Sequence, residues 1–380
     1  MKYFDYAASC PLDKEAAETF VKAATQYYGN SQSLHDTGSD ASSLLENCRS
    51  GWANLLQVQK EGIYFTSGGS EGNFLAVHAL LTAAKKKGKH IITSMAEHSS
   101  IHSTLEKLVN DHHYEVSAVP LDSNGIVDLN QLRSTIREDT VLITIQHGNS
   151  EIGTLQPLEE ISMLCKKNQI LFHSDCVHTF GKTDFSKMAL LADSLSISGH
   201  KFFGPKGTGA VYINPHLHWM PYYPKTSHER GFRLGTVNVP GIAAMTVAAQ
   251  KADKNLENNT NHYQQLRKTL LHALEPIQDQ YIIYGSDHNQ QLPSTIGMSL
   301  KGIEGQYVML ECNRMGFAVS TGSACQVGMQ TISKTMNAMG IAGKEAKEFI
   351  RISFGWNTTE ADTEALGKAL VRIAQEFLPS

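Results

Sequence analysis

Between residues 63 and 213 the sequence alternates between short apolar runs and longer amphipathic segments. The short runs are rich in β-branched and aromatic residues and lie at residues 63–66, 90–93, 114–120, 141–146, 170–175, 195–198 and 210–213. The longer segments have helical periodicity and lie at residues 73–86, 99–109, 128–137 and 158–167. Such repeated alternation of strand and helix predicts an α/β fold with a mostly parallel sheet covered on both faces.

The flanking regions indicate a second, smaller α/β domain. Helices are expected at residues 13–28 and 39–58, and one long helix at residues 241–274, ended by Pro276. Beyond it, short β runs at 281–284, 294–300, 317–320 and 349–354 alternate with helices at 306–315, 333–339 and 360–377. We expect a large domain over residues 15–255 and a small domain formed by residues 1–14 and 256–380.

Composition narrows the class of protein. Of 380 residues, 41% are hydrophobic and 18% are charged, and the formal net charge is −4, which is typical of a soluble globular protein and argues against nucleic acid as the main partner. No stretch reaches the ~18 apolar residues of a membrane span, and no signal-peptide core follows Met1. Six scattered cysteines do not make a disulfide framework. These features predict a cytoplasmic, enzyme-sized protein.

Lys201 occupies an unusual place in the stretch Ser198-Gly199-His200-Lys201. It follows a predicted strand and precedes a turn built on Gly204-Pro205-Lys206-Gly207. Ligands bind at strand ends in α/β sheets, so a lysine there is expected to face a crevice. Held out of water, it loses its proton more easily and becomes a Schiff-base candidate, although a surface loop lysine remains the alternative.

A glycine-rich turn follows the strand at residues 63–66. It reads Ser67-Gly68-Gly69-Ser70-Glu71-Gly72 and leads into a predicted helix, an arrangement that suits a phosphate group. It is neither the dinucleotide-binding pattern nor a P-loop, and a plain strand–helix turn is the alternative.

Asp175 ends another predicted strand. Its carboxylate is expected either to cap a helix or to hold a protonated ring nitrogen. The neighbours His173, Cys176 and His178 also allow a metal site, but alternate residues of a strand face opposite ways, so convergence of all four would need a sharp bend, and we predict no metal. His98 follows a further strand and gains a role only if a flat aromatic ligand lies at the same sheet edge.

Cys325 and Arg351 complete the candidates. Cys325 lies among small polar residues that cannot bury it, whereas the other five cysteines are expected to pack internally. It is the candidate nucleophile. Arg351 stands in an apolar β run and needs an anionic partner, either a substrate carboxylate or an internal salt bridge.

These motifs occur in the order found in one family. The sequence resembles the NifS/IscS-type cysteine desulfurases, which are class V aminotransferase-fold enzymes that use pyridoxal 5′-phosphate (PLP). The motifs that carry the resemblance are Gly29-Asn30, Ser33-Leu34-His35, Thr66 to Glu71, Glu151-Ile152-Gly153-Thr154, Ser198 to Lys201, Arg233-Leu234-Gly235-Thr236 and Gly322-Ser323-Ala324-Cys325. The resemblance runs from Phe4-Asp5-Tyr6 to Ser353-Phe354-Gly355 and implies PLP fold-type I, the aspartate aminotransferase-like architecture.

The resemblance also implies roles for single residues. Lys201 would hold PLP and then shuttle a proton, and Asp175 would pair with the ring nitrogen. His98 would stack on the ring and move protons, so Lys201, His98 and Cys325 are the expected catalytic residues. The phosphate would be held by Gly69, Ser70, Ser198 and His200, with Thr236 from the neighbouring subunit of a homodimer. Arg351 and Asn149 would bind L-cysteine, and Cys325 would take its sulfur as a persulfide, releasing L-alanine.

The implied acceptor of that sulfur is another protein: an iron–sulfur scaffold, a tRNA-thiolation enzyme or a client apoprotein. Two residues depart from the family pattern. Ser150 stands where the family usually has asparagine, and His178 stands where it usually has glutamine, so both cofactor contacts to the phenolic oxygen are altered. The alternatives are another PLP lyase or transaminase, including a selenocysteine lyase, and a metal-binding or sulfur-carrier protein.

Overall fold

A seven-stranded sheet dominates the computed structural model, which describes residues 1–286, 290–322 and 333–377. Its strands are β2 Ile63–Thr66, β3 His90–Ser94, β4 Glu115–Val119, β5 Thr140–Thr144, β6 Leu171–Asp175, β7 Ser194–Ser198 and β8 Gly209–Ile213, in the order β2-β8-β7-β6-β5-β3-β4. Only β8 is antiparallel to its neighbours, β2 and β7. All seven predicted strands are present, and the mostly parallel sheet is confirmed.

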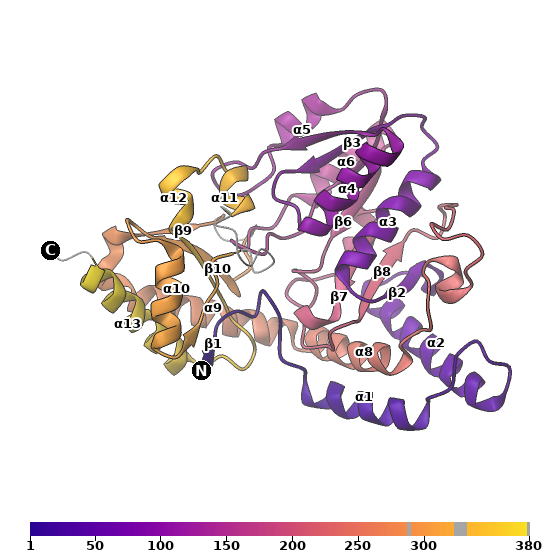
Figure 1. Ribbon diagram of the computed structural model, residues 1–380, viewed down its shortest axis with the longest axis horizontal. Coiled ribbons are helices and arrows are strands. Elements are labelled where there is room, and N and C mark those ends of the chain that lie inside the picture. Colours follow the sequence, from indigo (N-terminus) through magenta and orange to yellow (C-terminus); the bar gives the residue numbers. More distant parts are fainter. Residues whose placement is uncertain (287–289, 323–332, 378–380) are drawn as a thin grey trace.

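Helices cover both faces of this sheet (Figure 1). They are α1 Lys14–Gln26, α2 Asp36–Leu56, α3 Gly69–Ala83, α4 Ser99–His112, α5 Leu129–Thr135, α6 Leu158–Asn168, α7 Met188–Leu191 and α8 Val239–Lys254. Ile91 belongs to a hydrophobic cluster with α3 and α4, whereas its neighbour Ile92 belongs to a cluster with α2, α6 and α8. Because successive strand residues point to opposite faces, the buried apolar runs are explained by a sheet enclosed between two layers.

The starts of the first two helices depend on caps. The Asp13 side chain accepts hydrogen bonds from the N–H groups of Glu15 and Ala16, as predicted for the N-terminus of α1. Helix α2 begins at Asp36, three residues earlier than predicted, because the His35 ring accepts from the N–H of Gly38. Histidine is not a usual capping residue, so the sequence pattern did not indicate it.

The C-terminal part of the chain forms a second, smaller sheet. Strands β9 Tyr281–Tyr284, β10 Thr295–Leu300 and β12 Phe349–Ser353 pair antiparallel in the order β12-β10-β9, and β1 Lys2–Tyr3 pairs with β11 Phe317–Ala318. The helices here are α9 Leu256–Ala273, α10 Gly305–Arg314, α11 Lys334–Ala338, α12 Gly343–Lys347 and α13 Glu360–Phe377. Short 3₁₀ turns lie at Lys60–Gly62, Gly199–Lys201, His228–Gly231 and Glu275–Gln280.

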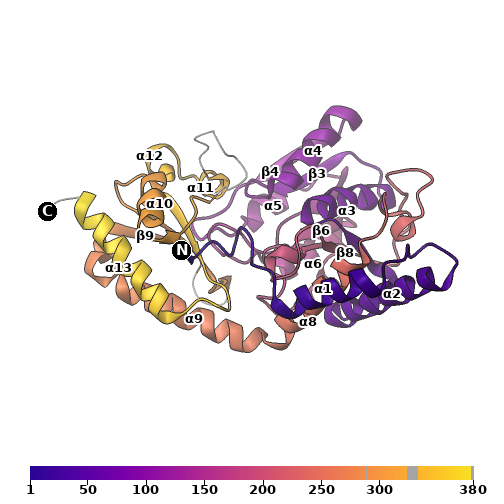
Figure 2. The ribbon, with the colours of Figure 1, turned by 60° about the horizontal axis from the view of Figure 1, so that its bottom comes forward.

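The predicted single helix over residues 241–274 is wrong. It is two helices, α8 and α9, because the backbone leaves helical geometry at Asn255 (φ −103°, ψ 13°), where the Asn255 side chain donates to the carbonyl of Lys251. Figure 2 shows α8 and α9 following one another beneath both parts of the molecule.

A separate hydrophobic cluster supports the smaller sheet. It joins Phe4 to residues of α9, α10, α13 and β10. The division at residues 14/15 and 255/256 stays a prediction. Within the described part of the chain, no helix combines the length and the hydropathy needed to cross a membrane.

Candidate active site

A cavity lies at the edge of the large sheet where parallel strands end. It is lined by residues from several separate stretches of the chain: Ala7, Ala8, Ala96, Glu97, His98, Ser99, Gln146, Asn149, Ser150, Glu151, Lys201, Gly322, Lys334, Thr335 and Arg351. The segments after β3, β5 and β7 all contribute, and the carboxyl ends of parallel strands share one edge of a sheet. The fold therefore brings together predicted residues that are up to 253 positions apart, from His98 to Arg351.

Lys201 is placed by the 3₁₀ turn that directly follows β7. Its Nζ donates to the carbonyls of Ala7 and Ala8. Burial lowers the pKa of Lys201 to about 8, and the nearby charges of Arg351 and Lys182 contribute to that decrease. An amine with this pKa is partly neutral near pH 7 and can attack a carbonyl carbon.

Asp175 is the last residue of β6. Its Oδ1 accepts from the N–H of Val177 at 2.9 Å, and its Oδ2 accepts from Asn73 Nδ2 at 2.7 Å. His98 caps α4, because its Nδ1 accepts from the N–H of Ser100 at 3.2 Å. Burial lowers the pKa of His98, so the neutral ring is favoured at pH 7.

The start of α3 has the features of an anion-binding site. Gly68 precedes the helix with φ 151° and no side-chain cap, so the first N–H groups of the helix are left for another acceptor. A Cβ on Gly69 would lie 2.4 Å from Val177 Cγ2 and 3.6 Å from Ser198 Cβ. Only glycine therefore lets the start of α3 pack this closely against Val177. Ser70 is exposed in the first turn of α3.

Two further predicted phosphate ligands differ in their surroundings. The His200 ring contacts Ser9 Oγ at 3.3 Å, and burial lowers the pKa of His200 to about 4. Thr236 is exposed on its own chain, in the segment before α8. Its predicted place in a neighbouring subunit stays a prediction.

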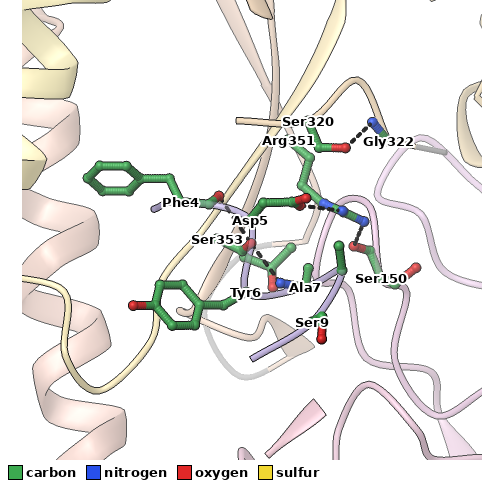
Figure 3. Close-up of polar contacts among 12 residues, drawn as sticks. Phe4, Asp5, Tyr6, Ala7, Ser9, Ser150, Ser320, Gly322, Arg351 and Ser353 are labelled. Carbon is green, nitrogen blue, oxygen red and sulfur yellow. Dashed lines mark hydrogen bonds and ion pairs between the residues drawn. The ribbon is translucent and has the colours of Figure 1, made fainter. Parts of the chain in front are cut away.

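Arg351, in β12, already has an internal ion pair, one of the two partners that the sequence left open. It is 3% exposed, and its Nη2 pairs with Asp5 Oδ1 at 2.7 Å while its Nη1 donates to the carbonyl of Ser150 at 3.1 Å (Figure 3). Arg351 Nε is buried without a hydrogen-bond partner among the described residues, and the predicted contact of Arg351 with a substrate carboxylate stays a prediction.

The amide of Asn149 shapes the turn after β5. Its Oδ1 accepts from the N–H groups of Glu151 and Ile152 at 2.8 and 3.0 Å, and its Nδ2 donates to Thr335 Oγ1 at 2.9 Å. Asn149 lines the cavity, but its side chain is occupied in joining this turn to α11. Its predicted contact with substrate stays a prediction.

The two residues that depart from the family pattern lie differently. Ser150 lines the cavity. His178 lies outside that lining; its Nε2 contacts Thr295 Oγ1 at 3.1 Å, and its buried Nδ1 has no partner among the described residues. Burial, with the charges of Lys182 and Lys201, holds the pKa of His178 well below its usual range. The neutral His178 ring is therefore favoured at pH 7, and its predicted contact with the cofactor stays a prediction.

Cys325 lies outside the described residues. Both ends of the segment that contains it reach the cavity, because Gly322 and Lys334 line it. Ser333 Oγ and the N–H of Thr335 both donate to Glu151 Oε2. The five other cysteines are buried and unpaired, which confirms their predicted packing role.

A metal site has little support in the part of the chain that the structure describes. No group of three or more His, Cys, Asp and Glu side chains gathers there as a metal site requires. The His173 ring nitrogens instead contact Ser194 Oγ at 2.7 Å and Asn73 Oδ1 at 3.1 Å.

Three polar residues near the site were missed from the sequence. Burial raises the pKa of Glu97 to about 8, and its Oε2 has no partner among the described residues. Burial lowers the pKa of Lys182 to about 8. Asn73 bonds to Asp175. A polar residue beside a predicted site residue, such as Glu97 before His98, was the available signal.

The residues present fit PLP. The glycine-lined helix start matches its phosphate, the Asp175 carboxylate its ring nitrogen, and the Lys201 amine its aldehyde. The site thus combines an anion-binding helix start, a carboxylate and an amine of lowered pKa at one edge of the sheet. This combination defines the site of a PLP enzyme of fold type I.

Over residues 2–366 the chain matches the family described as aminotransferase class-V, and it belongs to that family, among its NifS/IscS-type cysteine desulfurases. A NifS-type relative from Bacillus subtilis (strain 168) is 44% identical over 368 residues, which are 96% of this chain and 93% of that protein. The cysteine desulfurase IscS of Methanosarcina thermophila is 34% identical over 375 residues, 99% of this chain and 92% of the relative. The solved structure of a NIFS-like protein superposes with a TM-score of 0.90 at 32% identity, covering 99% of this chain and 100% of that one. The predicted family, fold type and PLP dependence are confirmed.

Proposed function

We propose that this enzyme removes sulfur from L-cysteine, releases L-alanine, and holds the sulfur as a persulfide on Cys325. In this reaction the Cys325 thiolate forms a bond to the substrate sulfur while the carbon–sulfur bond breaks. The carbon keeps the electron pair and gains a proton, which gives L-alanine. Bound PLP supplies an electron sink for negative charge on the substrate carbon.

The residues of the chain supply binding and proton transfer. Lys201 would hold the cofactor and would also move the proton at the substrate's α-carbon, a task that suits an amine with a pKa of about 8. Asp175 would hold the ring nitrogen, and neutral His98 would stack on the ring and move protons. Arg351 offers its remaining Nε donor, and by releasing Asp5 also Nη2, to the carboxylate of L-cysteine.

One observation carries this proposal: Lys201, His98 and Arg351 line the same cavity as both ends of the segment that contains Cys325. Cys325 follows Gly322 by three residues in the sequence, and Gly322 lines the cavity.

The site that binds the phosphate group of PLP is proposed to consist of Gly69, Ser70, Ser198 and His200, with Thr236 of a second copy of the chain. A homodimer is supported by the exposure of Thr236 and by apolar side chains on the surface, among them Leu34 (101% exposed) and Tyr28 (74%). We further propose that the homodimer works in the cytoplasm and passes its sulfur to an iron–sulfur scaffold, a thiolation enzyme or a client apoprotein.

Mass spectrometry after incubation with L-cysteine tests the function. We expect added sulfur on the peptide that contains Cys325 and an equal yield of alanine. The Cys325→Ala variant should stay yellow with PLP and lose both products, while the matched variant Cys312→Ala, which changes a buried cysteine, should keep them. Alanine formation by Cys325→Ala at the unmodified protein's rate would overturn the assignment.

A further inference from the structure

A line of side-chain hydrogen bonds connects Asp175 to His98, buried around Asn73 and exposed at His98. At its centre is Asn73 of α3, which is 1% exposed. Asn73 Nδ2 lies 2.7 Å from Asp175 Oδ2 and 3.0 Å from Ser100 Oγ, and Asn73 Oδ1 lies 3.1 Å from His173 Nε2. The Asn73 amide thus contacts three side chains: two from β6 and one from α4.

The direction of each bond follows from the carboxylate. An ionised carboxylate can only accept, so the amide nitrogen of Asn73, which has two hydrogens, must face Asp175. Its second hydrogen then points to Ser100 Oγ. The Asn73 oxygen accepts from His173, so that ring carries its proton on Nε2, and His173 Nδ1 accepts from Ser194 Oγ at 2.7 Å.

The second branch fixes the proton of His98. Ser100 Oγ accepts from Asn73 and lies 2.8 Å from His98 Nδ1, to which it donates its own hydrogen. The N–H of Ser100 donates to the same Nδ1 at 3.2 Å. With two donors aimed at Nδ1, the proton of the neutral ring is on Nε2.

We propose that Asn73 is a positioning residue that orients Asp175 and fixes the protonated nitrogen of His98 at the same time. This inference rests on the proposed function, because it takes Asp175 and His98 to contact PLP. The two donors on Asp175, from Asn73 and from the N–H of Val177, set the plane of the carboxylate and leave its remaining lone pairs for the ring nitrogen. Outer partners of this kind are what hold a ligand-binding group in its working geometry.

The Asn73→Asp variant separates hydrogen bonding from packing. Aspartate has nearly the size of asparagine, but it replaces the two donors with a second carboxylate next to Asp175. A space-filling role predicts behaviour like that of the unmodified protein. A positioning role predicts about a tenfold loss of PLP affinity, the effect of losing a hydrogen bond to a charged group, and a changed pH midpoint of the visible absorbance.

The experiment is a PLP titration of the cofactor-free protein, followed by a pH titration of the loaded protein. The matched control is Asn168→Asp, which makes the same change at the end of α6, where the side chain donates to the carbonyl of Leu164 and, within the described part of the chain, to no other group. Ser100→Ala removes the hydroxyl that links Asn73 to His98 and keeps the N–H donor to Nδ1. It should shift the pH profile of alanine formation without the tenfold loss of affinity.

Two outcomes overturn different claims. If the unmodified protein fails to bind PLP, the proposed function is wrong. If it binds PLP and Asn73→Asp binds equally well with the same pH midpoint, Asn73 is not a positioning residue. Should Asn73→Asp not fold, Ser194→Ala removes the donor to His173 at the far end of the line. It should then weaken PLP binding and change the pH midpoint, and unchanged values of both would overturn the inference.

Discussion

The Lys201 amine should react with PLP near neutral pH much faster than an exposed lysine does. Its pKa is about 8, against an ordinary value of 10.5. At pH 7 about one molecule in ten would then carry a neutral amine, against about one in three thousand for an exposed lysine, a difference of roughly 300-fold. Only the neutral amine is nucleophilic, so this fraction sets the rate of attachment.

The assay mixes cofactor-free protein with PLP between pH 6 and 10 and traps attached cofactor with borohydride. Below pH 8 the protonated form dominates, so the rate should rise about tenfold per pH unit. Above pH 8 the amine is already neutral, so the rate should level off. A rate that climbs steadily to pH 10 would refute the reasoning, because it would show an amine with an ordinary pKa.

Charge-removal variants test the cause. The charges of Arg351 and Lys182 disfavour the protonated amine of Lys201. Arg351→Gln and Lys182→Met should therefore raise its pKa and move the plateau to higher pH. Lys166→Met, at an exposed helix end, is the matched control and should leave the plateau in place.

Two further predictions concern stability and the site that binds the phosphate group. Arg49→Met should lower the free energy of unfolding, measured in urea, by about 3–5 kcal/mol, because it leaves the buried Glu229 carboxylate without its partner. The two side chains now pair at 2.8 and 2.9 Å. A loss no larger than that caused by Arg137→Met, which breaks an exposed ion pair, would contradict this. Gly69→Ala should weaken PLP binding about tenfold, because its Cβ would lie 2.4 Å from Val177 Cγ2 and displace the helix start. Adding Val177→Ala should restore most of the affinity, and a double variant as weak as Gly69→Ala would count against the steric reason.

The strands of the large sheet were predictable because each is a short run containing β-branched or aromatic residues, placed between longer segments of helical periodicity. The rule that ligands bind at strand ends also marked His98, Asp175 and Lys201 from their positions in the sequence. Less predictable was the break at Asn255, where a long polar helical pattern continues through a residue whose side chain bonds back to the preceding turn. Local periodicity carries no sign of such a break.

The amino-acid sequence alone specifies the order of strands and helices, the family motifs and the set of residues that could hold PLP, because these depend on short stretches of chain. The partners of those residues depend on the tertiary structure. Arg351 pairs with Asp5, 346 positions away, and Asp175 accepts from Asn73, 102 positions away. Folding also lowers the pKa of Lys201, through burial and through charges brought near it. Such partnerships and pKa shifts arise from distances in space, which neighbouring residues in a sequence do not specify.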